Sequence, residues 1–237
     1  FDSGSLSQDG QKQSFSGDDS DFDRNAVTVG ARLGLPELKL IGTDIHPFLS
    51  AQLGYATLDV DDVGGDVDPA LSYGLSGGAY VDVLEKLRVY TDLTYRDDLK
   101  HDLSGTSAGG GSISGDVDLS MLRARLGVMT VLGAWIATQS VLDRMILYGG
   151  VDLTRQTAEI NERVTYTDMY LSHAVTQVVA AEFVSTMLGI HGGVGYNFGK
   201  YGMVNLKLAL AAGATLAYLE YDLWQWVPPR RCCLWPF

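Results

Sequence analysis

The sequence predicts an all-β fold, an antiparallel, up-and-down transmembrane β-barrel of about 8 to 10 strands. Three observations lead to this class. Several long segments alternate strictly between apolar and other residues, as β-strands do. Their second face is rich in Gly, Ser, Asp, Arg and Tyr and poor in Lys and Glu. The connections alternate between tight turns and long stretches, an asymmetry that is usual in membrane barrels.

The stretch LGIHGGVGYNFG (188–199) carries the alternation most clearly. One face has large apolar residues such as Leu188 and Ile190, while the other is almost entirely glycine, with His191 and Asn197. Small residues with a few charges suit the crowded interior of a narrow closed barrel. The apolar face then points to lipid, and closure leaves no unpaired edge in the hydrocarbon.

The same alternation defines the expected strands, which are longer than the usual five or six residues of globular proteins. They cover residues 26–35, 45–59, 71–83, 87–98, 118–131, 145–158, 187–199 and 203–220. This set places the tight turns on the side opposite the termini. Bacterial barrels keep turns and termini on one side, so one further strand at each end, giving ten, would restore the usual arrangement.

The segments LEK (84–86) and GKYG (199–202) are expected as tight turns. Three long loops are expected over 59–70, 99–117 and 159–186. Residues 131–144 and 168–186 are compatible either with short helices at the rim or with poorly patterned strands. The barrel is expected as one domain over 1–237, in which 1–24 and 222–237 flank the patterned part and alternate poorly.

Composition narrows the class of partner and cofactor. The formal net charge of −12 argues against nucleic acid, which needs clustered Lys and Arg. Cys232 and Cys233 are adjacent and cannot staple distant parts of the fold, and no zinc-ligand spacing is present. The most apolar stretch, 203–221, is interrupted by polar and charged residues, which argues against a transmembrane helix. We expect no cofactor.

Charged residues on the predicted inner faces are the main candidate site. By the alternation, seven of them face the lumen: Arg88, Asp92, Arg96, Arg123, Arg125, Asp152 and Lys207. They form either an ion-pair network that plugs the barrel or the selectivity lining of a pore. Barrels of 8 to 10 strands are about filled by side chains, which favours the plug. His191 is expected to fill the lumen as a hydrogen-bonding residue.

Two other patterns carry weaker signals. The acidic loop DVDDVGGDVD (59–68) is a weak candidate for calcium through its aspartates, Asp59, Asp61, Asp62, Asp66 and Asp68. An EF-hand loop would need Glu where Ala70 stands, so a solvated acidic loop is the simpler interpretation. GLSGG (74–78) and HGGVG (191–195) imitate hydrolase motifs, but both lie inside alternating strands and in reversed order. We expect no enzymatic activity.

The alternating segments, the LEK and GKYG turns and the terminal Phe237 resemble small Gram-negative outer-membrane β-barrel proteins over roughly residues 25 to 221. This resemblance implies location in a bacterial outer membrane, with the signal peptide already removed before Phe1. Pro236 and the run VPPRR (227–231) depart from the usual C-terminal pattern. Aromatic residues near strand ends are candidates for the interfacial girdles: Phe48, Tyr55, Tyr95, Tyr218, Tyr221, Trp224 and Trp226.

The expected function is a structural or surface-interaction role, with long loops on one side and a plugged lumen. The expected partners are outer-membrane lipids and lipopolysaccharide, together with proteins that meet the loops. A narrow pore for ions or small solutes is one alternative. A soluble exported β protein that assembles through its apolar faces is another.

Overall fold

The structure is a computed structural model. It describes residues 3–8, 11–15, 22–40, 42–60, 66–84, 87–106, 111–135, 141–167, 174–198, 203–211 and 214–226. Almost all of them lie in β-strands, and two 3-10 turns, η1 (Leu132–Ala134) and η2 (Leu142–Arg144), are the helical elements among them. Helices of the length and apolarity needed to span a bilayer are absent from this part of the chain.

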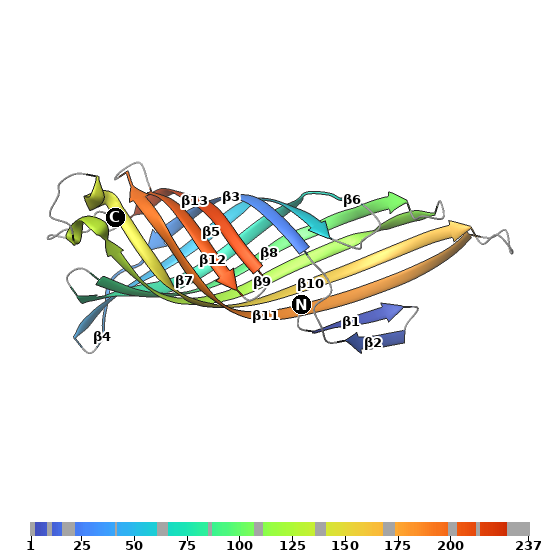
Figure 1. Ribbon diagram of the computed structural model, residues 1–237, viewed down its shortest axis with the longest axis horizontal. Helices are drawn as coiled ribbons and strands as arrows, with labels where there is room; N and C mark the ends of the chain where they lie inside the picture. Colours follow the sequence, from blue (N-terminus) through green and yellow to red (C-terminus); the bar gives the residue numbers. More distant parts are fainter. Residues whose placement is uncertain are drawn as a thin grey trace.

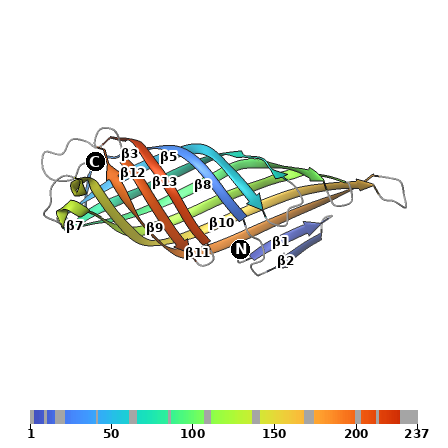
Figure 2. The ribbon, with the colours of Figure 1, turned by 45° about the horizontal axis from the view of Figure 1, so that its top comes forward.

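Nine long strands follow one another up and down around the molecule (Figures 1 and 2). They are β3 (Phe22–Gly34), β5 (Thr43–Val60), β7 (Ala70–Leu84), β8 (Leu87–Thr106), β9 (Ser112–Val131), β10 (Met145–Thr167), β11 (Ala174–Asn197), β12 (Met203–Ala211) and β13 (Ala214–Trp226). Each pairs antiparallel with the next. The all-β, antiparallel, up-and-down fold is therefore confirmed, with a strand number inside the predicted range.

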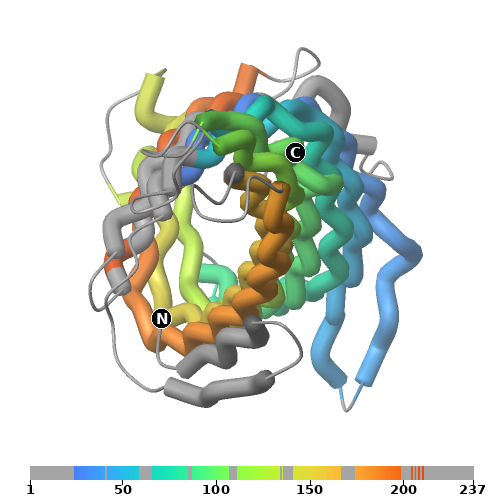
Figure 3. The backbone as a smooth tube through the Cα atoms, turned by 90° about the vertical axis from the view of Figure 1, so that its right-hand side faces the viewer, coloured from blue at the N-terminus to red at the C-terminus, as the bar shows by residue number. Residues whose placement is uncertain are grey.

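The first and last of these strands also pair with each other. β13 runs parallel to β3 through the pairs Asp222–Gly30, Gln225–Arg32 and Trp226–Leu33. The hydrogen-bonded neighbours thus lead around the nine strands and back to the first, and Figure 3 looks along this ring. The seam is parallel because an odd number of up-and-down strands brings two strands of the same direction together.

Four short strands complete the sheet. β4 (Leu38–Leu40) pairs with β5, and β6 (Asp66–Val67) pairs with β8. β1 (Ser3–Gln8) and β2 (Gln11–Phe15) form a hairpin whose first strand pairs with residues 179–184 of β11. This hairpin covers the edge that β11 exposes beyond its pairing with β12, which reaches only Gly189.

Several predicted boundaries are wrong. The predicted strand 203–220 is two strands, β12 and β13, so the ninth strand comes from within the predicted set rather than from one extra strand at each end. The predicted loops 99–117 and 159–186 are mostly strand, because β8 to β11 continue well past the predicted ends. The ambiguous segment 168–186 is strand from Ala174 onward, and 131–144 contains the two 3-10 turns. Strand structure also reaches into both predicted flanks.

The two ends of the ring differ. At one end, which we call the turn end, lie the connections β3–β5, β7–β8, β9–β10 and β11–β12. At the other, which we call the extended end, the four strands β8 to β11, each 20 to 24 residues long, project beyond the shorter β12 and β13 (Figure 1). The complete ring of nine strands therefore exists only in the half of the molecule nearer the turn end.

The outer surface of that half is apolar. Large side chains there are about half exposed, and we call this group the apolar belt: Leu33, Leu49, Leu53, Leu75, Leu93, Leu122, Leu126, Val128, Val151, Leu153, Leu188, Ile190, Leu206, Leu208 and Leu210. On β9 the belt runs from Leu122 to Val128, which is roughly 20 Å of strand at about 3.3 Å per residue. At a strand tilt of about 40° this stretch is roughly 15 Å tall, which fits within the hydrocarbon-facing band of about 25 Å in membrane barrels.

The extended end has the opposite polarity, as β9 illustrates. Toward the turn end its outward residues from Leu122 to Val128 are apolar, and its inward ones begin with Arg123 and Arg125 before Gly127, Met129 and Val131. Beyond Met121 the outward residues are Ser112, Ser114, Asp116, Asp118 and Ser120. The buried inward residues there are Ile113, Val117 and Leu119. Inside and outside therefore exchange character at Met121 and Leu122.

The neighbouring strand β10 changes at the same level. Its outward residues pass from Val151 and Leu153 to Glu159 and Asn161, and Gln156 is the register partner of Met121. Across β8, β9 and β10 the outer face of the extended end is joined by polar contacts. Lys100 Nζ lies 3.0 Å from Asp116 Oδ2, and Asn161 Nδ2 donates to the same oxygen at 3.2 Å.

Glycines on the inner faces make room for aromatic rings. Three direct cross-strand pairs place a ring opposite a glycine: Phe48–Gly78, Tyr90–Gly127 and Tyr148–Gly193. A Cβ on any of these glycines would lie within 2.8 Å of its partner's side chain. Phe48 is thus buried against the sheet interior, and its prediction as an interfacial aromatic is wrong. In the glycine-rich face of 188–199, Gly193 accommodates the Tyr148 ring.

Alanine substitutions at two adjacent glycines should differ in their effect on stability. A Cβ at Gly193 would lie 2.2 Å from the Leu206 carbonyl oxygen and 2.7 Å from the Tyr148 hydroxyl, whereas a Cβ at Gly192 would have its nearest neighbour at 3.5 Å. Gly193→Ala should lower the free energy of unfolding by about 1–3 kcal/mol through overpacking. Gly192→Ala should change it by less than about 0.5 kcal/mol. Urea titration of the refolded variants measures both changes in the free energy of unfolding. Equal losses in the two variants would contradict the close packing at Gly193.

Candidate functional site: the charged lumen

The inner faces of β8, β9 and β10 bring together the charged residues that alternation selects. The structure directs six of the seven predicted residues inward: Arg88, Asp92, Arg96, Arg123, Arg125 and Asp152. The side chain of the seventh, Lys207, lies outside the described residues. Arg88, Asp92, Arg123 and Asp152 are each less than a tenth exposed. Charges buried to this degree need partners, so the pairing decides what the lumen can do.

Asp92 and Arg125 face each other directly across β8 and β9. Arg125 Nε lies 2.9 Å from Asp92 Oδ1 and 3.1 Å from Oδ2, and the Thr94 hydroxyl donates to Oδ1 at 3.2 Å. The next residue in the same register row is Asp152 of β10. Arg123 Nε approaches Asp152 Oδ2 at 3.9 Å. The row therefore alternates in charge from strand to strand.

Arg88 lies on the inner face nearer the turn end. It is 1% exposed and pairs with Asp82 through Nε and Nη2. Its guanidinium carbon lies 4.3 Å from the centre of the Tyr80 ring. A carboxylate and an aromatic face together compensate a guanidinium that is removed from water.

Two polar contacts join strands that are not neighbours in the sheet. Arg96 Nη2 donates to Gln52 Oε1 at 3.1 Å, so this arginine contacts an amide on β5. The Tyr90 hydroxyl lies 2.5 Å from His191 Nε2. In the register, Gly127 and Gly150 separate these two residues, and their lack of side chains lets the tyrosine cross two strands. His191 is 8% exposed and faces the interior.

A second buried charge pair lies where the belt gives way to the extended end. Arg24 of β3 contacts Asp98 of β8 through Nε at 2.5 Å and Nη2 at 2.6 Å, and Nη2 also donates to the Ser72 hydroxyl at 3.0 Å. His101 Nε2 lies 3.6 Å from Asp98 Oδ2. Burial alone would raise the pKa of Asp98, but hydrogen bonds from Arg24, His101 and Ser72 outweigh it and hold that pKa well below its usual value.

Sequence reasoning missed this pair for two different reasons. Arg24 lies in the segment predicted as a flank. Asp98 was the final residue of the predicted strand 87–98, and its even number already placed it on the inner face with Arg88, Asp92 and Arg96. Alternation alone could therefore have found Asp98, but not its partner.

Apolar clusters lie on either side of the charged layer. Toward the extended end, Leu58, Val117, Leu119, Ala158 and Ile160 form a buried cluster, against which Val67, Ala181 and Phe183 pack. Toward the turn end, Val131 and Ile146 are buried against Met129 and Tyr148. The inside of the ring thus changes from apolar to charged and back to apolar along its length.

The remaining candidates are less informative. Asp66 and Asp68 are exposed, while the side chains of Asp59, Asp61 and Asp62 lie outside the described residues. Within the described part of the chain no group of three or more ligand-type side chains could hold a metal ion. Tyr55 and Tyr95 lie on the outer surface, 66% and 39% exposed. The side chains of Tyr218, Tyr221, Trp224 and Trp226 fall outside the description.

Models of known protein families, curated proteins and solved structures were compared with the chain, and none of them matches it. The geometry of the lumen therefore carries the functional argument. Its arginines contact carboxylates, an amide and aromatic faces, and apolar clusters lie on both sides of them. This arrangement connects the inner faces of several strands through paired charges.

Proposed function

We propose that this chain is a bacterial outer-membrane β-barrel with a structural or surface-interaction role. In this proposal the apolar belt faces the lipid and paired charges keep the lumen closed. The extended end stands in water, where it meets proteins. The observation that carries the proposal is the exchange of inside and outside polarity at one level on β9 and β10.

This exchange of polarity supports a membrane location, because one part of the same strand is suited to hydrocarbon and the other part to water. Toward the turn end, half-exposed leucines cover polar and charged residues, an arrangement that water disfavours and hydrocarbon favours. At the extended end, serines and aspartates cover a buried apolar cluster, as in a water-soluble protein. A protein wholly in water has no reason to expose its apolar face over only half of β9 and β10.

The contents of the lumen support a closed barrel rather than the narrow-pore alternative. Ion pairs join neighbouring strands on the inner face at Asp82–Arg88 and Asp92–Arg125, and apolar clusters lie on both sides of this charged layer. An ion that entered would have to pass apolar side chains and compete with existing pairs.

Conductance in a planar bilayer tests this closed state. The refolded protein should migrate faster on a gel before heating than after, which reports a folded barrel, and should give no steady current in the bilayer. Steady, discrete openings from protein with the same gel shift would contradict the closed lumen and support the narrow-pore alternative. A chain that stays monomeric and folded without detergent would overturn the membrane location itself.

A further inference from the structure

We propose that the outer face of β5, β7 and β8 binds one phospholipid with a primary ammonium head group, which sits at Asp97 while one acyl chain lies in an adjoining groove. This inference rests on the proposed membrane location and adds to it a specific ligand. The residues involved belong to the outer surface, separate from the lumen.

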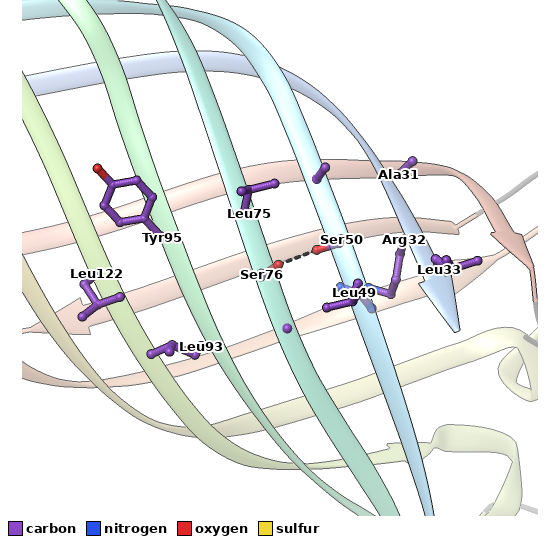
Figure 4. A pocket seen from close by; sticks show the side chains of 12 residues that line it. Ala31, Arg32, Leu33, Leu49, Ser50, Leu75, Ser76, Leu93, Tyr95 and Leu122 are labelled. Atoms are coloured by element: carbon purple, nitrogen blue, oxygen red, sulfur yellow. Dashed lines mark hydrogen bonds between the residues drawn. The ribbon is translucent and has the colours of Figure 1, made fainter. Parts of the chain in front are cut away.

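The groove lies within the apolar belt and has a volume of about 680 Å³. Its outward-facing residues come from the five neighbouring strands β3, β5, β7, β8 and β9, and several of them are labelled in Figure 4: Ala31, Leu33, Leu49, Ala51, Leu75, Gly77, Leu93, Tyr95 and Leu122. Ala31 and Ala51 are register partners, and Gly77 lies between Leu49 and Leu93. Small residues thus lower the surface between leucines, which leaves an apolar recess that suits an acyl chain.

Tyr95 belongs both to this groove and to a polar cluster beside it. Its hydroxyl donates to Asp97 Oδ2 at 2.5 Å, and the Tyr73 hydroxyl donates to the same oxygen at 3.3 Å. The two rings are 6.3 Å apart and inclined at 60°. A carboxylate flanked by two aromatic rings is the combination that recognises ammonium groups, through charge and through the ring faces.

The charge of this cluster has no cationic partner in the described part of the chain. Asp97 forms no ion pair there, and the nearby Lys100 contacts Asp116 instead. Asp118 lies on the same outer face, where burial and then the charge of Asp97 raise its pKa. The negative charge at Asp97 therefore favours binding of a cation that is not part of the protein. Asp97 lies at the end of the apolar belt, the level at which lipid head groups lie.

An ammonium phospholipid satisfies both parts at once. The head group supplies the missing positive charge, and the chain covers leucines that are half exposed. A phosphatidylglycerol lipid fills the groove equally well but lacks the ammonium, so it separates the two contributions. Two substitutions in the protein separate the same two contributions, because Asp97→Asn removes the charge while Ala51→Trp fills the groove.

The experiment titrates the full chain in a non-ionic detergent with phosphatidylethanolamine or phosphatidylglycerol of identical chains, and counts bound lipid by native mass spectrometry. We expect the wild type to prefer phosphatidylethanolamine by about fivefold, the ratio that one modest ion pair provides. Asp97→Asn should bind both lipids equally, and Ala51→Trp should weaken both. Asp102→Asn on the exposed outer face of β8 and Ile190→Trp on β11, away from the groove strands, serve as matched controls and should behave as wild type.

Equal binding of the two lipids by the wild type, or an undiminished preference in Asp97→Asn, would overturn the site. Binding of phosphatidylglycerol that appears only with Mg²⁺ would also overturn it, because a bridging cation would then occupy Asp97. In either case a requirement for detergent would leave the membrane location standing. Failure of the proposed function is distinguishable, since the chain would then remain dispersed without detergent.

Discussion

Leu126→Arg is expected to destabilise the folded protein in lipid by about 2–4 kcal/mol, the cost of a cation near the bilayer midplane of a membrane barrel. Leu126 is 55% exposed and lies near the middle of the apolar belt on β9. In water a half-exposed leucine is replaced by arginine with little effect, because the new side chain is solvated. Urea titration in lipid vesicles measures the difference.

Ser114→Arg is the matched control for this variant. Ser114 faces outward on the same strand, 12 residues away, but beyond the level where polarity changes. It should shift the free energy of unfolding by less than about 0.5 kcal/mol. Similar, small effects of the two substitutions would contradict a membrane-facing belt and favour the soluble, self-assembling alternative.

Asp98→Ala is expected to cost about 3–5 kcal/mol, because it leaves the Arg24 guanidinium without its carboxylate in a largely buried place. Asp102→Ala, an exposed aspartate on the same strand, should change stability by less than about 0.5 kcal/mol. Replacing both partners, as Arg24→Met with Asp98→Leu, should recover much of the loss, since no charge is then left unpaired. A double variant no more stable than Asp98→Ala would contradict the pairing.

The same pair predicts a dependence on pH. The pKa of Asp98 is lowered in the folded protein, so its contribution is fully present above the ordinary value of 3.8. As the pH falls below 3.8 toward the folded pKa, the carboxylate is protonated and the contribution is lost. The stability difference between wild type and Asp98→Asn should therefore be constant near neutral pH and shrink in acid. A stability difference that grows in acid would contradict the lowered pKa of Asp98.

The sequence predicts the half of the fold that carries the apolar belt better than the extended half, and β9 explains why. The predicted strand began at residue 118, near the point where the outward residues change from leucines to serines and aspartates. Beyond that point the alternation continues with inverted polarity, and the Ser- and Gly-rich stretch 104–116 looks like a flexible loop. The stretch becomes part of a hairpin only through the pairing of β8 with β9. Local composition does not predict such pairing.

Other misses have different physical causes. The turn between β12 and β13 falls inside a continuous apolar alternation, so the segment 203–220 was predicted as a single strand. Phe48 was placed with the interfacial aromatics because it lies near a strand end. Its true environment depends on the cross-strand partner Gly78, whose missing side chain leaves space for the ring inside.

The lumen illustrates what alternation can and cannot provide. It gives the side on which Arg88, Asp92 and Arg125 lie, since each strand has a period of two. It does not give their partners, which depend on register. Asp92 meets Arg125 because the two are opposite across β8 and β9, and Tyr90 reaches His191 only because two glycines separate them.

Depth-dependent quenching along β9 tests the central claim most directly, namely that the apolar belt faces lipid and the extended end faces water. Single fluorophore-labelled cysteines would be placed at the outward positions Ser114, Asp118, Leu122 and Leu126, in a chain whose Cys232 and Cys233 are replaced by serine. Each refolded variant would be exposed in vesicles to lipids with brominated acyl chains and to aqueous iodide.

The account predicts that labels at Leu122 and Leu126 are quenched by the brominated chains, and most strongly at Leu126. Labels at Ser114 and Asp118 should instead be quenched by iodide. The change from one quencher to the other should fall between residues 118 and 122, where the outer face exchanges its polarity. Quenching by iodide at all four positions would contradict the membrane location.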